Sequence, residues 1–112
     1  MFETEEQKER IILVAVATAD GDDTEQSLDE LEELGQTAGA VTVAKVIQNR
    51  EKVHAGTYVG KGKIEEIKNL AISLDADTVV CDDELSPAQY HNLQDALEIK
   101  VIDRTVMILD IF

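Results

Sequence analysis

A continuous apolar run at residues 11–17 (IILVAVA) constrains the fold of this chain more than any other feature. A strand with one face in water alternates apolar and polar residues, whereas a run without polar positions suits a strand covered on both faces. Such strands occur in parallel sheets that carry helices on both sides. The run therefore predicts a central parallel strand in an α/β domain.

Three further β-rich segments follow, at residues 41–47, 77–81 and 99–102, and helical patterns separate them. This alternation predicts a four-stranded parallel sheet with helices on both faces, in the order βαβαβαβα and with right-handed crossovers. We expect the strand order 2-1-3-4. The length of 112 residues predicts a single α/β domain over residues 10–112, after a flexible polar tail at residues 1–9.

Local signals predict where the helices begin. Ser27 with Glu30, and Ser86 with Gln89, match the capping box, in which two side chains satisfy the free amides of a helix start. A further helix is expected from about Gly60. These positions follow the predicted strands and agree with the alternation above.

Asp103 is predicted to cap a last helix that runs to the end of the chain. The segment 106–112 (VMILDIF) is almost wholly apolar and stops without a glycine or a basic last turn. Helices rarely end in this way, because their last carbonyls need partners and their apolar face needs a neighbour. We therefore expect a longer protein, with this helix leading into a linker. The alternative is a terminal helix docked on the sheet.

Composition excludes several classes of protein. No apolar run approaches the ~20 residues that a membrane helix needs, and the N-terminus lacks the pattern of a secretory signal. The single cysteine, Cys81, ends an apolar run and suits a buried thiol in a reducing compartment. We expect a cytoplasmic protein that binds neither membrane nor DNA.

The charge is distributed unevenly. The chain carries 10 basic and 24 acidic residues, yet the span 45–68 holds six basic residues and only three acidic ones. A basic island on an acidic body predicts a face for an anion such as a phosphate backbone, and the alternative is an ordinary solvated loop. The residues expected to contact RNA are Arg50, Lys52, Tyr58, Gly60, Lys61, Gly62 and Lys63.

Within this island, residues 57–63 (TYVGKGK) open a predicted helix. Glycines allow a ligand to approach the backbone, helix amides bind anions, and the Tyr58 ring can either stack on a base or simply pack. The segment is not a Walker A loop, because Ile64 stands where a hydroxyl would bind Mg²⁺. No catalytic residues and no metal site are predicted.

Two acidic loops offer an alternative function. Residues 20–23 and 82–84 are expected at the edge of the sheet where strand order reverses, and their carboxylates could hold Mg²⁺ or accept a phosphoryl group, as in a receiver domain. A receiver also needs a lysine after a fifth strand, and no fifth strand is predicted. Acidic turns also serve as helix caps.

Several short segments, in their order along the chain, resemble the N-terminal domain of HflX-type GTPases. They are residues 27–34 (SLDELEEL), 37–40 (TAGA), 57–63 (TYVGKGK), 82–87 (DDELSP), 101–105 (VIDRT) and 108–112 (ILDIF). The resemblance covers nearly the whole chain, and Val106 and Met107 depart from it, since glycine or alanine followed by leucine is more usual there.

This resemblance implies a ribosome-associated protein of the cytoplasm. Family members bind the large ribosomal subunit, and some split stalled ribosomes under stress. A helical linker and a G domain, which carries the GTP and Mg²⁺ sites, follow this domain in the family. The expected partners are therefore ribosomal RNA and the protein's own G domain, and no cofactor is expected within these 112 residues. The domain could also regulate GTP turnover instead of docking.

Overall fold

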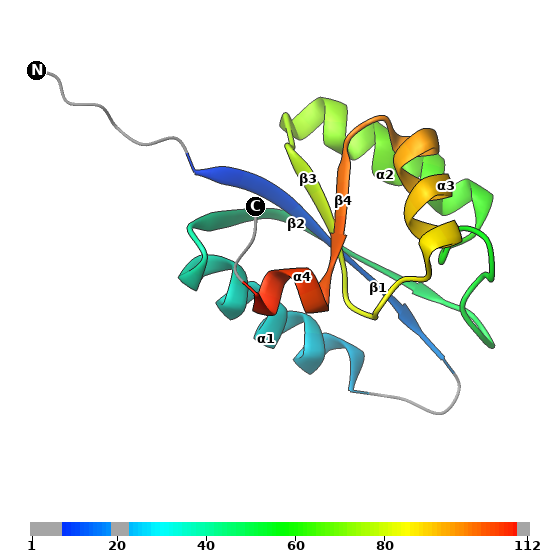
Figure 1. Cartoon of the computed structure of the whole chain (residues 1–112), viewed down its shortest axis with the longest axis horizontal. Helices are drawn as coiled ribbons and strands as arrows, with labels where there is room; N and C mark the ends of the chain where they lie inside the picture. Colours follow the sequence, from blue (N-terminus) through cyan, green and yellow to red (C-terminus); the bar gives the residue numbers. More distant parts are fainter. Residues whose placement is uncertain (1–7, 19–22, 110–112) are drawn as a thin grey trace, which may run out of the picture.

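A computed structural model describes residues 8–18 and 23–109 as one parallel sheet between two layers of helices (Figure 1). The strands are β1 (Glu9–Ala17), β2 (Ala40–Asn49), β3 (Thr78–Cys81) and β4 (Lys100–Asp103), and the helices are α1 (Thr24–Thr37), α2 (Lys61–Leu74), α3 (Pro87–Leu97) and α4 (Arg104–Ile108). The strand order is β2-β1-β3-β4, and each pairing is parallel. The predicted fold class and strand order are confirmed.

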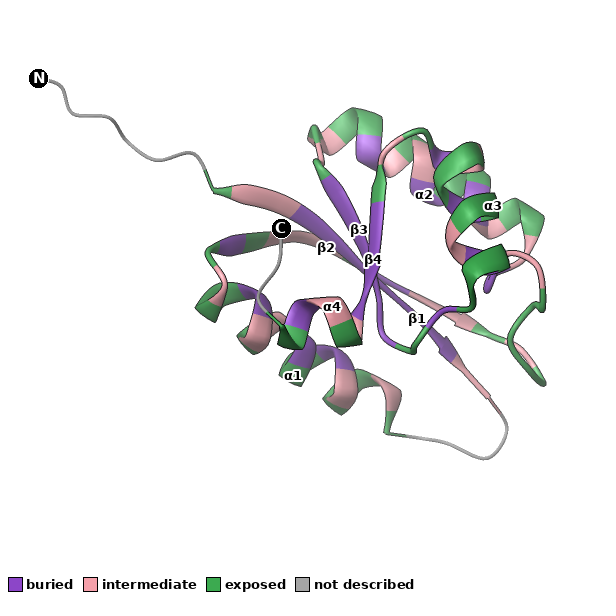
Figure 2. Cartoon of the chain, in the orientation of Figure 1, coloured by how far each residue is buried: buried purple, intermediate pink, exposed green. Residues whose placement is uncertain are grey.

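The apolar run in β1 is buried from both sides (Figure 2). Its even-numbered residues join the core shared with α2 and α3, and its odd-numbered residues join the core shared with α1 and α4. Every residue from Ile11 to Val16 is at most 8% exposed. The lack of polar positions in this strand thus follows from the two helix layers that cover it.

The two predicted capping boxes have different outcomes. In α3, the Ser86 hydroxyl accepts from the Gln89 amide at 3.1 Å and the Gln89 side chain accepts from the Ser86 amide at 2.9 Å, so this box is confirmed. The box at Ser27 is wrong, because α1 begins earlier and the Ser27 amide donates to the Asp23 carbonyl at 2.9 Å. The Ser27 hydroxyl accepts from Arg104 instead.

The ends of the domain agree with the predictions only in part. Asp103 caps α4 as expected, because its carboxylate accepts from the Val106 amide at 3.2 Å. The predicted continuation of this helix to residue 112 lies outside the described residues. β1 begins at Glu9, the last residue of the predicted tail, and residues 1–7 lie outside the described part. Within that part, no helix is long and apolar enough to cross a membrane.

The segments that follow the strands meet at one edge of the sheet, since all the strands run in the same direction (Figure 1). Three of them matter below. They are the loop at residues 50–60 after β2, the loop at residues 82–86 after β3, and the start of α4 after β4. This edge is where ligands bind in open α/β sheets.

Candidate nucleic-acid interface

The 50–60 loop carries most of the residues predicted to contact RNA, and backbone hydrogen bonds shape it. Its first amide, that of Arg50, donates to the Ala17 carbonyl at 3.0 Å. His54 and Tyr58 form a small antiparallel bridge, with N–H to carbonyl distances of 3.1 and 2.9 Å. Tyr58 adopts φ 69°, a conformation that a non-glycine residue rarely adopts outside tight turns. The loop is therefore a folded turn.

Side chains of α3 attach this turn to the rest of the domain. The Gln89 amide nitrogen donates to the His54 carbonyl at 2.9 Å, and the Asn92 amide nitrogen donates to the Gly56 carbonyl at 2.9 Å. Within the turn, His54 Nδ1 accepts from the Gly56 and Thr57 amides at 3.0 and 3.1 Å. Because Nδ1 is an acceptor here, the neutral ring carries its proton on Nε2.

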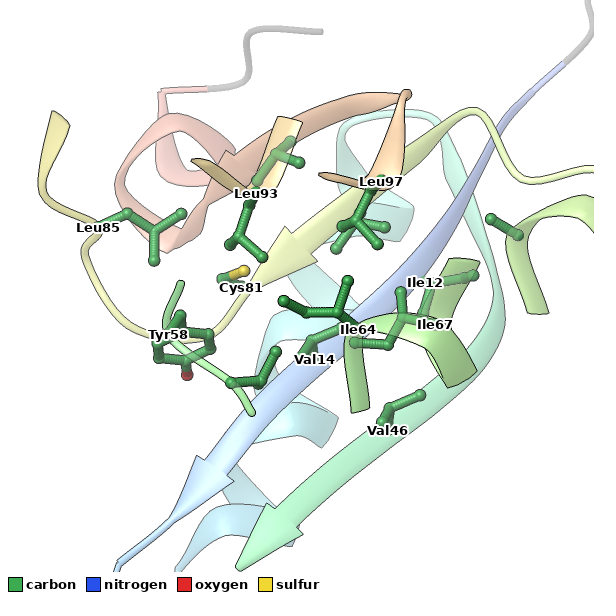
Figure 3. Packing of buried hydrophobic residues seen from close by; sticks show 14 of the residues in the cluster. Ile12, Val14, Val46, Tyr58, Ile64, Ile67, Cys81, Leu85, Leu93 and Leu97 are labelled. Carbon is green, nitrogen blue, oxygen red and sulfur yellow. The ribbon is translucent and has the colours of Figure 1, made fainter. Parts of the chain in front are cut away.

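Tyr58 does not offer its ring to solvent. The side chain is 1% exposed and lies in the core with Val14, Cys81 and Leu85 (Figure 3). Its hydroxyl donates to Asp83 Oδ2 at 2.7 Å. Burial raises the pKa of this hydroxyl far above its ordinary value, and the hydrogen bond to Asp83 adds to the shift. The expectation that Tyr58 stacks on a base is therefore wrong, because the ring serves as the anchor of the loop.

The N-terminus of α2 has no side-chain cap. Gly60 occupies the N-cap position with extended backbone, and the first turn contains no acidic residue. The Gly60 amide itself donates to Gln48 Oε1 at 2.8 Å. The amides of the first turn have no partner within an α-helix, so this end carries partial positive charge and attracts anions.

Arg50 lies against Gly60. A Cβ atom at residue 60 would come within 2.9 Å of Arg50 Nη1 and 3.3 Å of Gln48 Nε2. Arg50 Nε donates to the Lys52 carbonyl at 3.1 Å, which holds the guanidinium in this place. The space left by Gly60 is thus filled by two side chains of this protein and not reserved for a ligand. Gly62 differs, because a Cβ there would meet no atom within 4 Å.

The structure brings the four predicted cationic residues, Arg50, Lys52, Lys61 and Lys63, to the same end of the molecule. They differ in exposure and in ion pairing. Lys52 and Lys61 are exposed, and Arg50 is partly exposed. Lys63 forms an ion pair with Glu66 at 3.0 Å. Among the residues of this chain that the structure describes, no carboxylate lies within ion-pair distance of the other three. Beside Arg50, the ends of β1 and β2 surround an open hollow of about 370 Å³.

The acidic loop at residues 82–86 is occupied by internal contacts. Arg104 Nη2 donates to Asp82 Oδ1 at 2.7 Å and to the Ser27 carbonyl and hydroxyl, both at 2.9 Å. Asp83 accepts from Tyr58. Asp103 Oδ2 accepts from the Leu85 amide at 2.9 Å. Asp82 and Asp83 of the alternative prediction therefore have partners within the domain, whereas Glu84 is exposed.

The other half of that alternative is only partly visible. Residues 20 and 22 lie outside the described residues, and Asp23 sits at the N-cap position of α1. In the ranges 8–18 and 23–109, no three His, Cys, Asp or Glu side chains gather in a way that could hold a metal ion. The geometry favours the cationic end of the sheet edge as the candidate site.

Sequence reasoning missed the residues that position this site. Gln89 was assigned to a helix cap, and it also holds the 50–60 loop, 35 residues away in sequence. Asn92, Gln48 and Asp83 make contacts over separations of 36, 12 and 25 residues. No local pattern signals such contacts, since each depends on how the helices pack on the sheet.

Comparisons with known proteins agree with this fold and place it in a longer context. The family model described as "GTP-binding GTPase N-terminal" matches residues 25–112. A protein named GTPase HflX from Lacrimispora saccharolytica is 65% identical over the full chain, and one from Escherichia coli is 38% identical over the full chain; the chain covers 26% of each. It thus spans about a quarter of these curated relatives.

A solved structure shares the fold. It is that of a GTP-binding protein from Sulfolobus solfataricus in complex with GDP, with a TM-score of 0.56 and 17% identity. The likeness covers 88% of this chain and 29% of that one. At this level of identity, the comparison supports the architecture alone.

Proposed function

This chain belongs to the GTP-binding GTPase N-terminal family, and on that premise we propose that it is the RNA-docking domain of an HflX-type GTPase. Its partner is RNA of the large ribosomal subunit, in the cytoplasm, in a protein that acts on stalled ribosomes under stress. We assign docking and no catalysis to residues 1–112. GTP hydrolysis belongs to the part of the relatives that this chain does not span.

GTP and Mg²⁺ do not fit the residues present here. Ile64 follows Gly62 and Lys63 where a phosphate-binding loop needs a hydroxyl for the metal. Within residues 8–18 and 23–109, no three His, Cys, Asp or Glu side chains lie together so that they could hold the metal ion. We therefore place both groups in the G domain.

One observation carries the docking proposal. Lys61 in the first turn of α2, Arg50 against the N-cap Gly60, and Lys52 in the same loop as Arg50 have no carboxylate partners in the described part of the chain, and this helix end has no side-chain cap. Cations at this end of a helix repel the partial positive charge of its amides, and acidic residues are the usual choice there. An RNA phosphate removes this repulsion, because it can accept hydrogen bonds from the amides and pair with the cations.

The remaining surface directs RNA to this end. α1 contains five acidic residues and no basic one, and Lys45 pairs with two of them, Asp29 and Glu32. These hydrogen-bonded partners raise the pKa of Lys45. A phosphate backbone is repelled by the α1 face and attracted by the start of α2, so electrostatics selects one orientation of binding.

The test is the salt dependence of binding to purified large ribosomal subunits. Each phosphate contact contributes about one unit to the slope of log affinity against log salt. Lys61→Ala/Lys63→Ala should therefore reduce the slope by about one unit, because Lys63 already pairs with Glu66 and only Lys61 contacts a phosphate. Lys68→Ala is the matched control, because it removes a positive charge from the third turn of the same helix, where Lys68 pairs with Glu98. An unchanged slope in the double variant would contradict docking through this surface.

A second function is favoured by the exposed apolar end of α4. Ile108 and Leu109 are 59% and 62% exposed, at the limit of the described residues. We propose that they contact the G domain and tune its GTP turnover. The measurement compares the GTPase rates of the full-length protein with and without residues 1–112. An equal rate, with ribosome binding lost on truncation, would leave docking as the only function.

A further inference from the structure

The 50–60 loop is held in place before any ligand arrives. Gln89 and Asn92 of α3 donate to its carbonyls at 2.9 Å each, and the Tyr58 hydroxyl donates to Asp83 at 2.7 Å. Tyr58 itself is 1% exposed, so loosening the loop would also expose a large core side chain. The spacing of the cations on the loop is therefore fixed by the fold.

The same contacts withdraw the Tyr58 ring from the surface, where it could have stacked on a base of an unpaired strand. Proteins that bind single strands stack successive bases on exposed aromatic side chains, and each base contributes about 1–3 kcal/mol. Tyr58 is turned inward, and Tyr90, on α3, is half-buried with its hydroxyl inaccessible. His54 is exposed, but its Nδ1 is engaged by two amides of the turn, so this edge of the ring is not free to read a base.

Base-paired RNA matches these properties. An A-form helix presents phosphates and 2′-hydroxyls at regular positions, and proteins recognise it by shape and backbone contacts. Cations carried on a preformed loop backbone lose less freedom on meeting a rigid RNA backbone, whereas a flexible strand must also be ordered at a cost in affinity.

We infer that Gln89, Asn92 and Asp83 are positioning residues which preform the 50–60 loop for a base-paired RNA backbone and not for an unpaired strand. This inference rests on the proposed docking function and specifies its ligand. The phosphates contact Arg50, Lys52 and Lys61, and the positioning residues touch only the loop.

The first experiment measures the affinity of the 112-residue chain for a fluorescent RNA hairpin and for an unpaired RNA of the same length and composition, by anisotropy over a series of salt concentrations. We expect the hairpin to bind about tenfold more tightly or better, with the larger salt slope, because duplex phosphates are more densely spaced.

The second experiment loosens the loop without touching the cations. Asn92→Ala and Tyr58→Phe should each weaken hairpin binding several-fold at an unchanged salt slope, since the number of phosphate contacts is retained. Amide hydrogen exchange should accelerate at Gly56 and Thr57. The matched controls are Asn69→Ala, on the exposed side of α2, and Tyr90→Phe, whose hydroxyl lies near Asp103 and not on the loop.

The outcomes separate the two proposals. If both RNAs bind equally, or the unpaired strand binds better, the inference is overturned while RNA docking stands. The same holds if the loop variants leave hairpin affinity unchanged despite faster exchange. If neither RNA binds and Lys61→Ala/Lys63→Ala leaves ribosome binding unaltered, the docking function fails and the inference fails with it.

Discussion

Two stretches of like charge reach the same edge of the sheet and are used in opposite ways. In the 82–86 loop and at the start of α4, the carboxylates of Asp82, Asp83 and Asp103 all have partners within the domain. In the 50–60 loop and at the start of α2, Lys52 and Lys61 have no carboxylate partner among the described residues.

The contrast shows how to separate a structural charge from one available to a ligand. Asp82 and Asp103 are 9% and 2% exposed, and their hydrogen bonds offset part of the free-energy cost of burying them. Lys52 and Lys61 remain in water, where a charge needs no partner. The acidic stretch therefore stabilises the fold, and the cationic stretch is free to bind. The predictions below test this difference.

The largest effect is expected for Arg104→Ala. This substitution leaves the nearly buried Asp82 without its cation, so the free energy of unfolding should fall by about 3 kcal/mol. This value is the lower end of the range for a broken buried ion pair, because Arg104 is 26% exposed. Urea denaturation measures this. Lys8→Ala, an exposed control, should change stability by about 0.5 kcal/mol or less. A similar small loss for Arg104→Ala would contradict a structural role for the acidic loop.

A smaller effect concerns Tyr58, which joins the two stretches. Burial raises the pKa of Tyr58 and of Tyr90 in the folded chain. The folded state therefore keeps protons that the unfolded state releases above pH ~10. The buried Tyr58 should remove about 1.4 kcal/mol of stability per pH unit in that range, and the more exposed Tyr90 should remove less. Stability is fully present below this pH and is lost as the pH rises.

Tyrosinate absorbance during an alkaline titration checks this, because the chain has two tyrosines and no tryptophan. We expect both rings to ionise together as the chain unfolds, at a pH above their ordinary pKa. Tyr58→Phe should flatten the decline of stability with pH. If one tyrosine titrates near pH ~10 with the fold intact, the loop is more open than its contacts imply.

The smallest effects compare the two glycines at the start of α2. Gly62→Ala should stabilise the chain by up to about 1 kcal/mol, because alanine favours the helix and a Cβ there meets open space. Gly60→Ala should destabilise it by about 1 kcal/mol, since alanine is a poor N-cap and the Cβ displaces Arg50. Thermal unfolding measures both. If both substitutions changed thermal stability equally, the position of the Arg50 side chain would not depend on the space left by Gly60.

The predictions from sequence that succeeded rest on local patterns. The order of the strands followed from one run buried on both faces and from the alternation of elements. Ser86 was predicted correctly because its cap involves only Gln89, three residues on. Ser27 shows the same pattern, yet Arg104, 77 residues away, takes its hydroxyl. A single sequence does not distinguish these two serines.

The sequence by itself determined the parallel α/β sheet, the acidic body and the cationic segment, because periodicity and charge are properties of neighbouring residues. Only the tertiary structure decided that Tyr58 points inward, that Asp82 belongs to Arg104, and that α3 holds the 50–60 loop. These choices depend on which side chains meet after the helices pack on the sheet. Such contacts join distant parts of the chain, and burial makes each of them energetically decisive.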